Sequence, residues 1–124
     1  MTRLAAFVAL MATACTPTQL HWFHHDATPA QRDAVVAHLS RPTLTPFLRC
    51  VRHHESRGDY GAQNPRSSAS GAFQFVDGTW RTVSRSAGHP GYPTAASAPP
   101  WVQDAVAIHT VRTVGRSPWA GTGC

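Results

Sequence analysis

The chain has 124 residues, a length suited to one domain, and its 42% hydrophobic and 14% charged content is typical of a globular protein rather than a disordered one. All its positive charge is arginine, and eleven arginines against six acidic residues give a formal net charge of +5. This balance favours an anionic partner. The arginines are scattered and no nucleic-acid-binding motif organises them, so nucleic acid is not the expected partner and a solvated basic surface explains many of them.

The first 14 residues are typical of an export signal. Arg3 precedes an apolar run that is too short to span a bilayer and ends in the small residues Ala12-Thr13-Ala14. We therefore predict a signal peptide over 1–14 and an extracellular or cell-wall location. Cys15 stands where a lipoprotein receives its lipid, so free secretion and a membrane anchor at Cys15 both stay open.

Residues 15–44 are predicted to be a linker with one helix. Its first part, "HWFHHD", gathers histidines and aromatics. Its second part opens with Thr28 as N-cap, Pro29 at the first helical position and Gln31 three residues after the cap, and it ends at Ser40.

A second helix is predicted from the start signal Thr45-Pro46. Apolar residues recur at spacings of three and four and lead to Glu55 on the same face. We expect the helix to end at Gly58, which places Glu55 in its last turn. The helix dipole does not stabilise a negatively charged carboxylate at that end.

Residues 58–76 are rich in turn formers and include Phe73 and Phe75 on one side with Gln74 on the other, which predicts a small hairpin or loop pair. Asp77 is expected to be the N-cap of a short helix that stops at Gly88. After a proline-rich loop, a last helix over 101–115 is predicted. Its expected buried stripe comprises Val102, Ala105, Val106, His109 and Val114.

Two cysteines remain once Cys15 is set aside. An even number in an exported chain predicts a bond between Cys50 and Cys124. In the chain-entropy model, a disulfide that closes the long loop from Cys50 to Cys124 stabilises the folded state by about 4 kcal/mol. This is a large contribution for a small domain.

Glu55 is the single glutamate, and its surroundings suggest glycosidic chemistry. Cleaving a glycosidic bond needs a carboxylic acid that can donate a proton. Aromatics that stack on sugars and polar groups that bind hydroxyls or N-acetyl groups follow it: Tyr60, Asn64, Phe73, Gln74, Phe75, Thr79, Trp80, Trp101 and Trp119. A second carboxylate would have to be an aspartate, and Asp59 and Asp77 are poor candidates, so a mechanism with one acid is the better prediction.

The stretch "CVRHHESRGDYGAQNPRSSASGAFQFVDGTW" with the closing "SPWAGTGC" resembles the transglycosylase-like domain of resuscitation-promoting factors. It is also similar in outline to goose-type lysozymes and bacterial lytic transglycosylases, in which Glu-Ser is followed by Gly-x-x-Gln, here Gly71 to Gln74. The resemblance covers residues 45–124. It implies an α+β, lysozyme-like fold that is mainly helical, with a short hairpin or loop region beside the cleft.

The resemblance further implies that Glu55 is the catalytic acid for the β-1,4 bond between N-acetylmuramic acid and N-acetylglucosamine in cell-wall remodelling. It also implies that Gln74, Thr79, Trp80 and Trp119 line the glycan cleft and that Cys50 pairs with Cys124. The expected partner is peptidoglycan, with a peptidoglycan endopeptidase as a second candidate. No cofactor is expected, and whether water or the sugar's own 6-hydroxyl attacks stays open.

Three other interpretations are weaker. A metal site formed by the histidines is not expected, because His53 and His54 are adjacent on a helix and point about 100° apart. His54 is expected to pack near Glu55 or in the core. A serine hydrolase is disfavoured because no serine stands in a nucleophile elbow. The leading alternative is a non-catalytic exported module that binds the cell wall through a lysozyme-like cleft.

Overall fold

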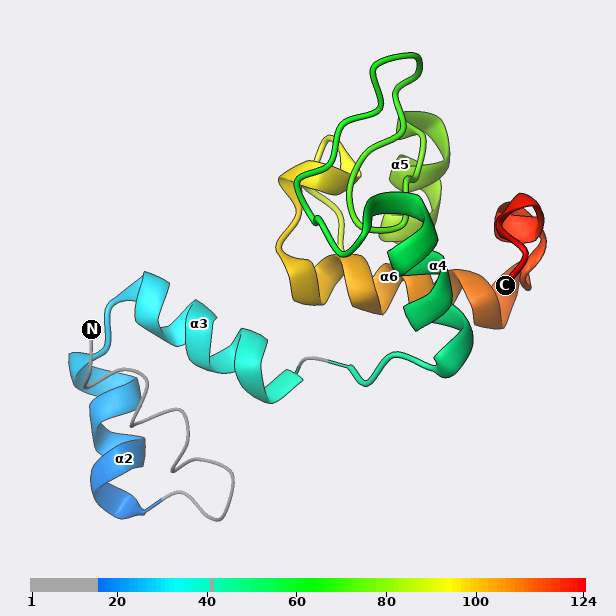
Figure 1. The fold of residues 1–124 in the computed structure, drawn as a ribbon. Helices are drawn as coiled ribbons and strands as arrows, with labels where there is room; N and C mark the ends of the chain where they lie inside the picture. The colour runs from blue at the N-terminus through cyan, green and yellow to red at the C-terminus, as the bar shows by residue number, and fades with distance from the viewer. Residues whose placement is uncertain (1–15, 41) are drawn as a thin grey trace. The chain divides into compact units, whose positions relative to one another are not determined.

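The computed structural model describes residues 16–40 and 42–124, which fall into two compact units divided between Arg41 and Pro42. Figure 1 follows the chain through both units. The signal peptide and the lipidation site predicted at Cys15 lie outside the described residues. Across the described ranges, no helix has the length and apolar character needed to cross a bilayer.

The first unit is more helical than the sequence suggested. Helix α2 (Pro17–His21) continues into a π-helical turn, η1 (Trp22–Asp26), where we expected an irregular linker. Helix α3 (Pro29–Ser40) has the predicted bounds. Its capping box is present, because the Thr28 N–H donates to Gln31 Oε1 at 2.8 Å and the Gln31 N–H donates to Thr28 Oγ1 at 3.3 Å. The sequence prediction placed one helix in residues 15–44 and missed α2, whose start is marked by the same kind of capping box, formed by Thr16 and Gln19.

The second unit contains helices α4 (Pro46–Ser56), α5 (Asp77–Ser86) and α6 (Pro100–Thr113), with the 3₁₀ turns η2 (Ala95–Ser97) and η3 (Ser117–Thr122). Its β-structure is limited to two isolated antiparallel bridges, Gln63 with Ser70 and Ser70 with Phe75. These bridges organise the loop between α4 and α5. The prediction of a small, mainly helical domain with a short loop region is confirmed.

A single hydrophobic core holds the second unit together. Helix α5 packs on α6, and α4 packs on η3. The core is built by apolar side chains from every one of these elements and from the loops: Leu44, Leu48, Val51, Ala72, Phe73, Phe75, Trp80, Val83, Ala95, Ala98, Val102, Val106, Ala107 and Trp119. Burial of these side chains is the main stabilising contribution.

The stripe predicted for α6 is partly wrong. Val102 and Val106 are buried, whereas Val114 is 55% exposed because α6 ends at Thr113. Between the buried valines, the helix also buries two polar residues, Gln103 and Asp104.

Helix α5 begins earlier than expected. Asp77 is its first residue and not its N-cap, because the chain is already helical there; the N-cap is Val76, whose side chain accepts no hydrogen bond. The cap prediction for Asp77 is therefore wrong. The carboxylate nevertheless lies in the first turn of α5, where the helix dipole favours negative charge.

The C-terminal segment returns to α4. Cys50 and Cys124 form a disulfide across 74 residues, with their Cα atoms 5.9 Å apart. Between α6 and this bond, η3 buries Trp119, whose ring lies edge-on to Phe47 of α4 at 6.3 Å between centroids. Arg116 covers the Phe47 ring from outside, with its guanidinium 4.5 Å from the centroid.

Candidate functional site

Helix α4 carries Glu55 to the surface from the core. Thr45 caps its start by accepting the Leu48 N–H at 3.3 Å, and Leu48 and Val51 anchor its inner face. The helix ends where Arg57 adopts a left-handed conformation, with φ of 54°. Glu55 lies in this last turn, as predicted, and its side chain is half-buried.

Ser56 attaches the end of α4 to the following loop. Its hydroxyl lies 2.9 Å from the Ala72 carbonyl oxygen and 3.1 Å from the Arg52 carbonyl oxygen, and it accepts the Gly58 N–H at 3.2 Å. Because Ser56 directly follows Glu55, these bonds determine where the glutamate backbone lies relative to residues 71–75. The Glu-Ser pair therefore combines a candidate acid with the residue that holds it in place.

The turn at 71–75 requires a glycine at its first position. Gly71 has φ of 80°, and a Cβ atom there would collide with Gln103 Oε1. Gln74 closes the turn through its side-chain amide, which donates to the Gly71 carbonyl at 3.0 Å, and its own φ is 54°. The Gly-x-x-Gln motif thus describes a compact turn that leaves Gln74 half-exposed.

Gln103 is the support beneath this turn. Its side chain is 1% exposed and bonds to three segments. Its Oε1 accepts the Ala72 N–H at 2.9 Å, and its Nε2 donates to the carbonyls of Ala98 at 2.9 Å and Tyr60 at 3.0 Å. All the hydrogen-bonding capacity of this buried amide group is thereby engaged, except for one lone pair on its oxygen.

A buried polar network adjoins the same helix end. Tyr60 donates its hydroxyl to Asp104 Oδ1 at 2.6 Å and accepts from Arg52 Nη1 at 3.1 Å. Asp104 is 1% exposed, so a charged acceptor there needs such donors. Tyr60 was expected to contact sugar, and the structure shows that its hydroxyl also joins α4 to α6.

Sequence reasoning missed Arg52, Gln103 and Asp104 as parts of this region. The available signal was the pair Gln103-Asp104 inside the apolar run of α6. Two neighbouring polar residues there cannot both avoid the core, and a buried polar side chain needs partners.

Three aromatics expected to line the cleft are buried in the core. Phe73 is 1% exposed, Trp80 is 0% and Trp119 is 5%. The two indole N–H groups are already engaged, Trp119 with the Phe73 carbonyl at 3.0 Å and Trp80 with the Tyr92 carbonyl at 2.9 Å. The expectation that these three rings stack on sugar needs correction, because their faces pack against other core side chains.

The remaining predicted residues lie at the surface. Asn64 is exposed and accepts the Arg66 N–H at 2.8 Å, which shapes the loop between the bridge partners Gln63 and Ser70. Thr79 is exposed in the first turn of α5. Asp59 is exposed and accepts the Gly61 N–H at 2.8 Å. His54 is exposed, so of the two positions expected for it, near Glu55 or in the core, the core position is wrong.

The histidine-rich segment is ordered by ring contacts. The His21 and His25 rings stack at 4.5 Å between centroids. Within the described ranges, no group of three or more His, Cys, Asp or Glu residues is arranged to hold a metal ion.

Known proteins resemble this chain over 72 to 93 of its residues. It is 49% identical over 72 residues to a protein named probable transglycosylase SceD 2 of Staphylococcus saprophyticus, a match covering 58% of the chain and 28% of the relative. It is 42% identical over 80 residues to probable transglycosylase SceD 3 of the same organism, covering 64% and 33%. A probable transglycosylase SceD of Staphylococcus aureus is 36% identical over 93 residues, covering 75% and 38%.

The chain therefore spans about a third of the length of these relatives. No model of a protein family matches it, and no solved structure matches it. The predicted resemblance to transglycosylase-like domains is confirmed by the three relatives.

Proposed function

We propose that this chain, like the transglycosylases it resembles, is an enzyme that cleaves the glycan strands of peptidoglycan. The bond attacked is the β-1,4 link between N-acetylmuramic acid and N-acetylglucosamine, and Glu55 is the general acid. One observation carries the proposal: the single glutamate is held at the surface end of α4, and Ser56 bonds that end to the turn that presents Gln74.

A mechanism with one carboxyl group fits the aspartates of the second unit. Asp104 is buried against Tyr60, and Asp59 accepts its own loop's N–H. Asp77 lies in the first turn of α5, where its Oδ1 is buried and makes no hydrogen bond among the described residues, so it is held away from the solvent-exposed end of α4 only by its position on another helix. Glu55 therefore protonates the leaving glycosidic oxygen and then, as a carboxylate, accepts the proton of the attacking hydroxyl. Attack by the 6-hydroxyl of the muramic acid gives a 1,6-anhydro ring, and attack by water gives a reducing end.

Substrate contacts come from the accessible polar side chains near this helix end and on α5. Gln74 and Tyr60 are half-exposed, and Asn64 and Thr79 are exposed. These groups hydrogen-bond sugar hydroxyls and N-acetyl groups. Phe73, Trp80 and Trp119 contribute indirectly, because they belong to the hydrophobic core that supports the turn containing Gln74.

The location follows from the same substrate. The protein is exported, and it acts at the cell wall either freely or held to the membrane by a lipid on Cys15. Cell-wall remodelling is its role. An endopeptidase that cuts the peptide stems is the natural partner, because cleavage of both polymers opens the mesh.

Muropeptide mass spectrometry tests the proposal. Purified peptidoglycan is incubated with the wild-type chain, with Glu55→Gln and with Asp59→Asn, each shown to be folded by circular dichroism. We expect wild type and Asp59→Asn to release the same fragments, because Asp59 is an exposed carboxylate with a local role only. Glu55→Gln lacks the proton donor, and its rate should fall at least ~100-fold.

Each outcome has a clear meaning. Anhydro-muramyl ends identify a transglycosylase, and reducing ends identify a muramidase. If Asp59→Asn loses as much activity as Glu55→Gln, the single-acid mechanism is wrong. If wild type binds peptidoglycan and releases nothing, the chain is a wall-binding module and the enzyme proposal is rejected.

A further inference from the structure

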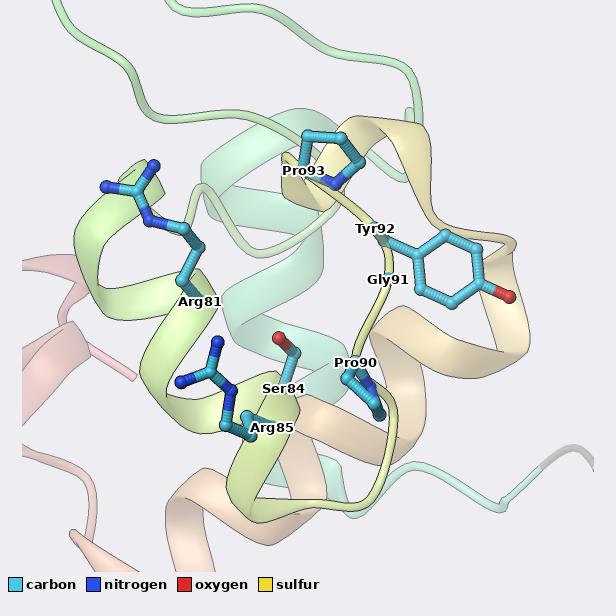
Figure 2. A pocket seen from close by; sticks show the side chains of 7 residues that line it. All are labelled: Arg81, Ser84, Arg85, Pro90, Gly91, Tyr92 and Pro93. Carbon is cyan, nitrogen blue, oxygen red and sulfur yellow. The ribbon is translucent and has the colours of Figure 1, made fainter.

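We propose that the second unit carries a separate binding site for carboxylate groups, formed by α5 and the loop that follows it. The site is a hollow of about 240 Å³, here called the α5 pocket. It is lined by Arg81, Ser84, Arg85, Pro90, Gly91, Tyr92 and Pro93 (Figure 2). The identity of its ligand rests on the proposed function, because peptidoglycan carries free carboxylates on its peptide stems.

Two arginines form one side of the α5 pocket. Arg81 and Arg85 are four residues apart on α5, so they project from successive turns of the same face (Figure 2). Both are exposed, and neither has an ion pair or a side-chain hydrogen bond among the described residues. Like charges at this spacing repel each other, and a bound anion relieves that repulsion.

The lining of the pocket contains no acidic residue. The same two arginines also line a neighbouring hollow with Gly78, Thr82 and Ser86, which likewise lacks an acidic residue. Neither hollow therefore contributes a carboxylate that could neutralise the guanidinium pair; Asp77, four residues before Arg81 on α5, lines neither of them.

Ser84 provides a third donor at the base of the pocket. The residue is only 2% exposed, and its hydroxyl makes no hydrogen bond within the described part of the chain. A helical serine commonly bonds back to the carbonyl four residues earlier, and this one does not. Figure 2 places its oxygen between the two arginines and the loop at 90–93. The hydroxyl is reached from the pocket, so it can donate a hydrogen bond to a ligand there.

The opposite wall is held in place before any ligand binds. The Trp80 indole N–H donates to the Tyr92 carbonyl at 2.9 Å, and the His89 N–H donates to the Ser84 carbonyl at 2.8 Å. Gly91 turns the chain with φ of 99°, between two prolines of restricted conformation. A pre-formed wall lowers the entropy lost on binding.

These groups fit a carboxylate on a short side chain. A guanidinium binds a carboxylate through two parallel N–H donors, and two guanidiniums with a hydroxyl complete its acceptor positions. The volume suits a stem-peptide carboxylate better than a pair of sugar rings. The α5 pocket would thus bind the peptide stems while Glu55 acts on the glycan.

The test measures binding without cleavage, in full-length chain carrying Glu55→Gln. The pocket variant is Arg81→Gln with Arg85→Gln, and the control is Arg66→Gln with Arg112→Gln, which removes the same charge from exposed sites elsewhere. Co-sedimentation is measured with three materials: walls that retain phosphodiester-linked polymers, peptidoglycan freed of those polymers, and the freed peptidoglycan after chemical amidation of its carboxylates.

We expect the pocket variant to bind the carboxylate form at least ~10-fold more weakly than the parent, as loss of charge-assisted hydrogen bonds implies, and the control pair to stay within about 2-fold. Amidation should weaken the parent by the same factor and leave the pocket variant unchanged. Equal binding by the two double variants, or parent binding that survives amidation, overturns the proposal. So does a loss seen only with walls that retain phosphodiester polymers, which would make the ligand a phosphate.

Failure of the proposed function gives a different result. If the chain with Glu55 intact releases no muropeptides and the arginine-dependent binding persists, the proposed carboxylate site is supported and the proposed enzymatic function is rejected. If cleavage occurs and binding ignores both arginines, only the α5 pocket is rejected.

Discussion

At the scale of single residues, the site depends on side chains that need particular neighbours. Gly71 is a clear case, since it combines a left-handed backbone with a close approach to Gln103. Gly91 has the left-handed backbone alone, with no atom within 4 Å of a Cβ built there. Substitutions at these two glycines can therefore distinguish the cost of backbone strain from the cost of a steric collision.

We predict that Gly71→Ala lowers the free energy of unfolding by more than Gly91→Ala. Both changes force alanine into a left-handed conformation, at a cost of about 1–2 kcal/mol. Only Gly71→Ala also pushes a Cβ into the Gln103 amide, which adds ~1–3 kcal/mol. Urea denaturation of the two variants measures the difference. Equal losses would mean that Gln103 moves aside at no cost.

The residue scale also shows how far sequence reasoning reached. The position of Glu55 follows from a capping threonine, an apolar stripe and a left-handed stop, all local signals, and it is where the sequence placed it. The burial of Phe73, Trp80 and Trp119 could not be foreseen, because an aromatic side chain serves a core or a sugar site equally well. Which of these it does depends on the neighbours that the fold supplies.

At the scale of elements, helix termini explain most of the agreement and disagreement. α3 and α4 begin at threonines that accept backbone N–H groups, and both starts were predicted. α5 begins after Val76, whose side chain cannot cap. Instead, the Asp77 N–H donates to Ser68 Oγ at 3.1 Å, and Trp80 and Val83 pack into the core; such tertiary contacts have no local signature.

A better cap should therefore stabilise α5. We predict that Val76→Ser raises the free energy of unfolding by about 0.5–2 kcal/mol, because the serine hydroxyl can accept a free N–H of the first turn. Val76 is 42% exposed, so little burial is lost. Val114→Ser is the matched control, a 55% exposed valine beyond α6 where no such N–H is available. Thermal denaturation by circular dichroism compares the two, and equal shifts would contradict the capping argument.

At the scale of the whole second unit, the Cys50 to Cys124 bond links its two ends. The bond joins α4 to the segment after η3, across the full core. Sequence reasoning proposed the pair from the number of cysteines and from the family resemblance. The path of the tail came only from the structure, because it depends on Trp119 packing against Phe47 and Phe75.

We predict that the double variant Cys50→Ser, Cys124→Ser unfolds at a lower urea concentration than wild type, with a loss of about 2–5 kcal/mol. The missing bond enlarges the conformational freedom of the unfolded chain. Dithiothreitol should destabilise wild type by the same amount and leave the variant unchanged. A reductant effect that persists in the variant would show that the bond is not its cause.

The Gln103 amide also limits which segments of the second unit can open locally. It joins segments around residues 60, 72 and 98, so none of them can open without breaking a bond to the same buried group. In native-state hydrogen exchange, such segments behave as one cooperative unit with one opening free energy. We therefore expect the loop that presents Gln74 to exchange its amide protons together with the part of α6 around Gln103, and not as an independent flap.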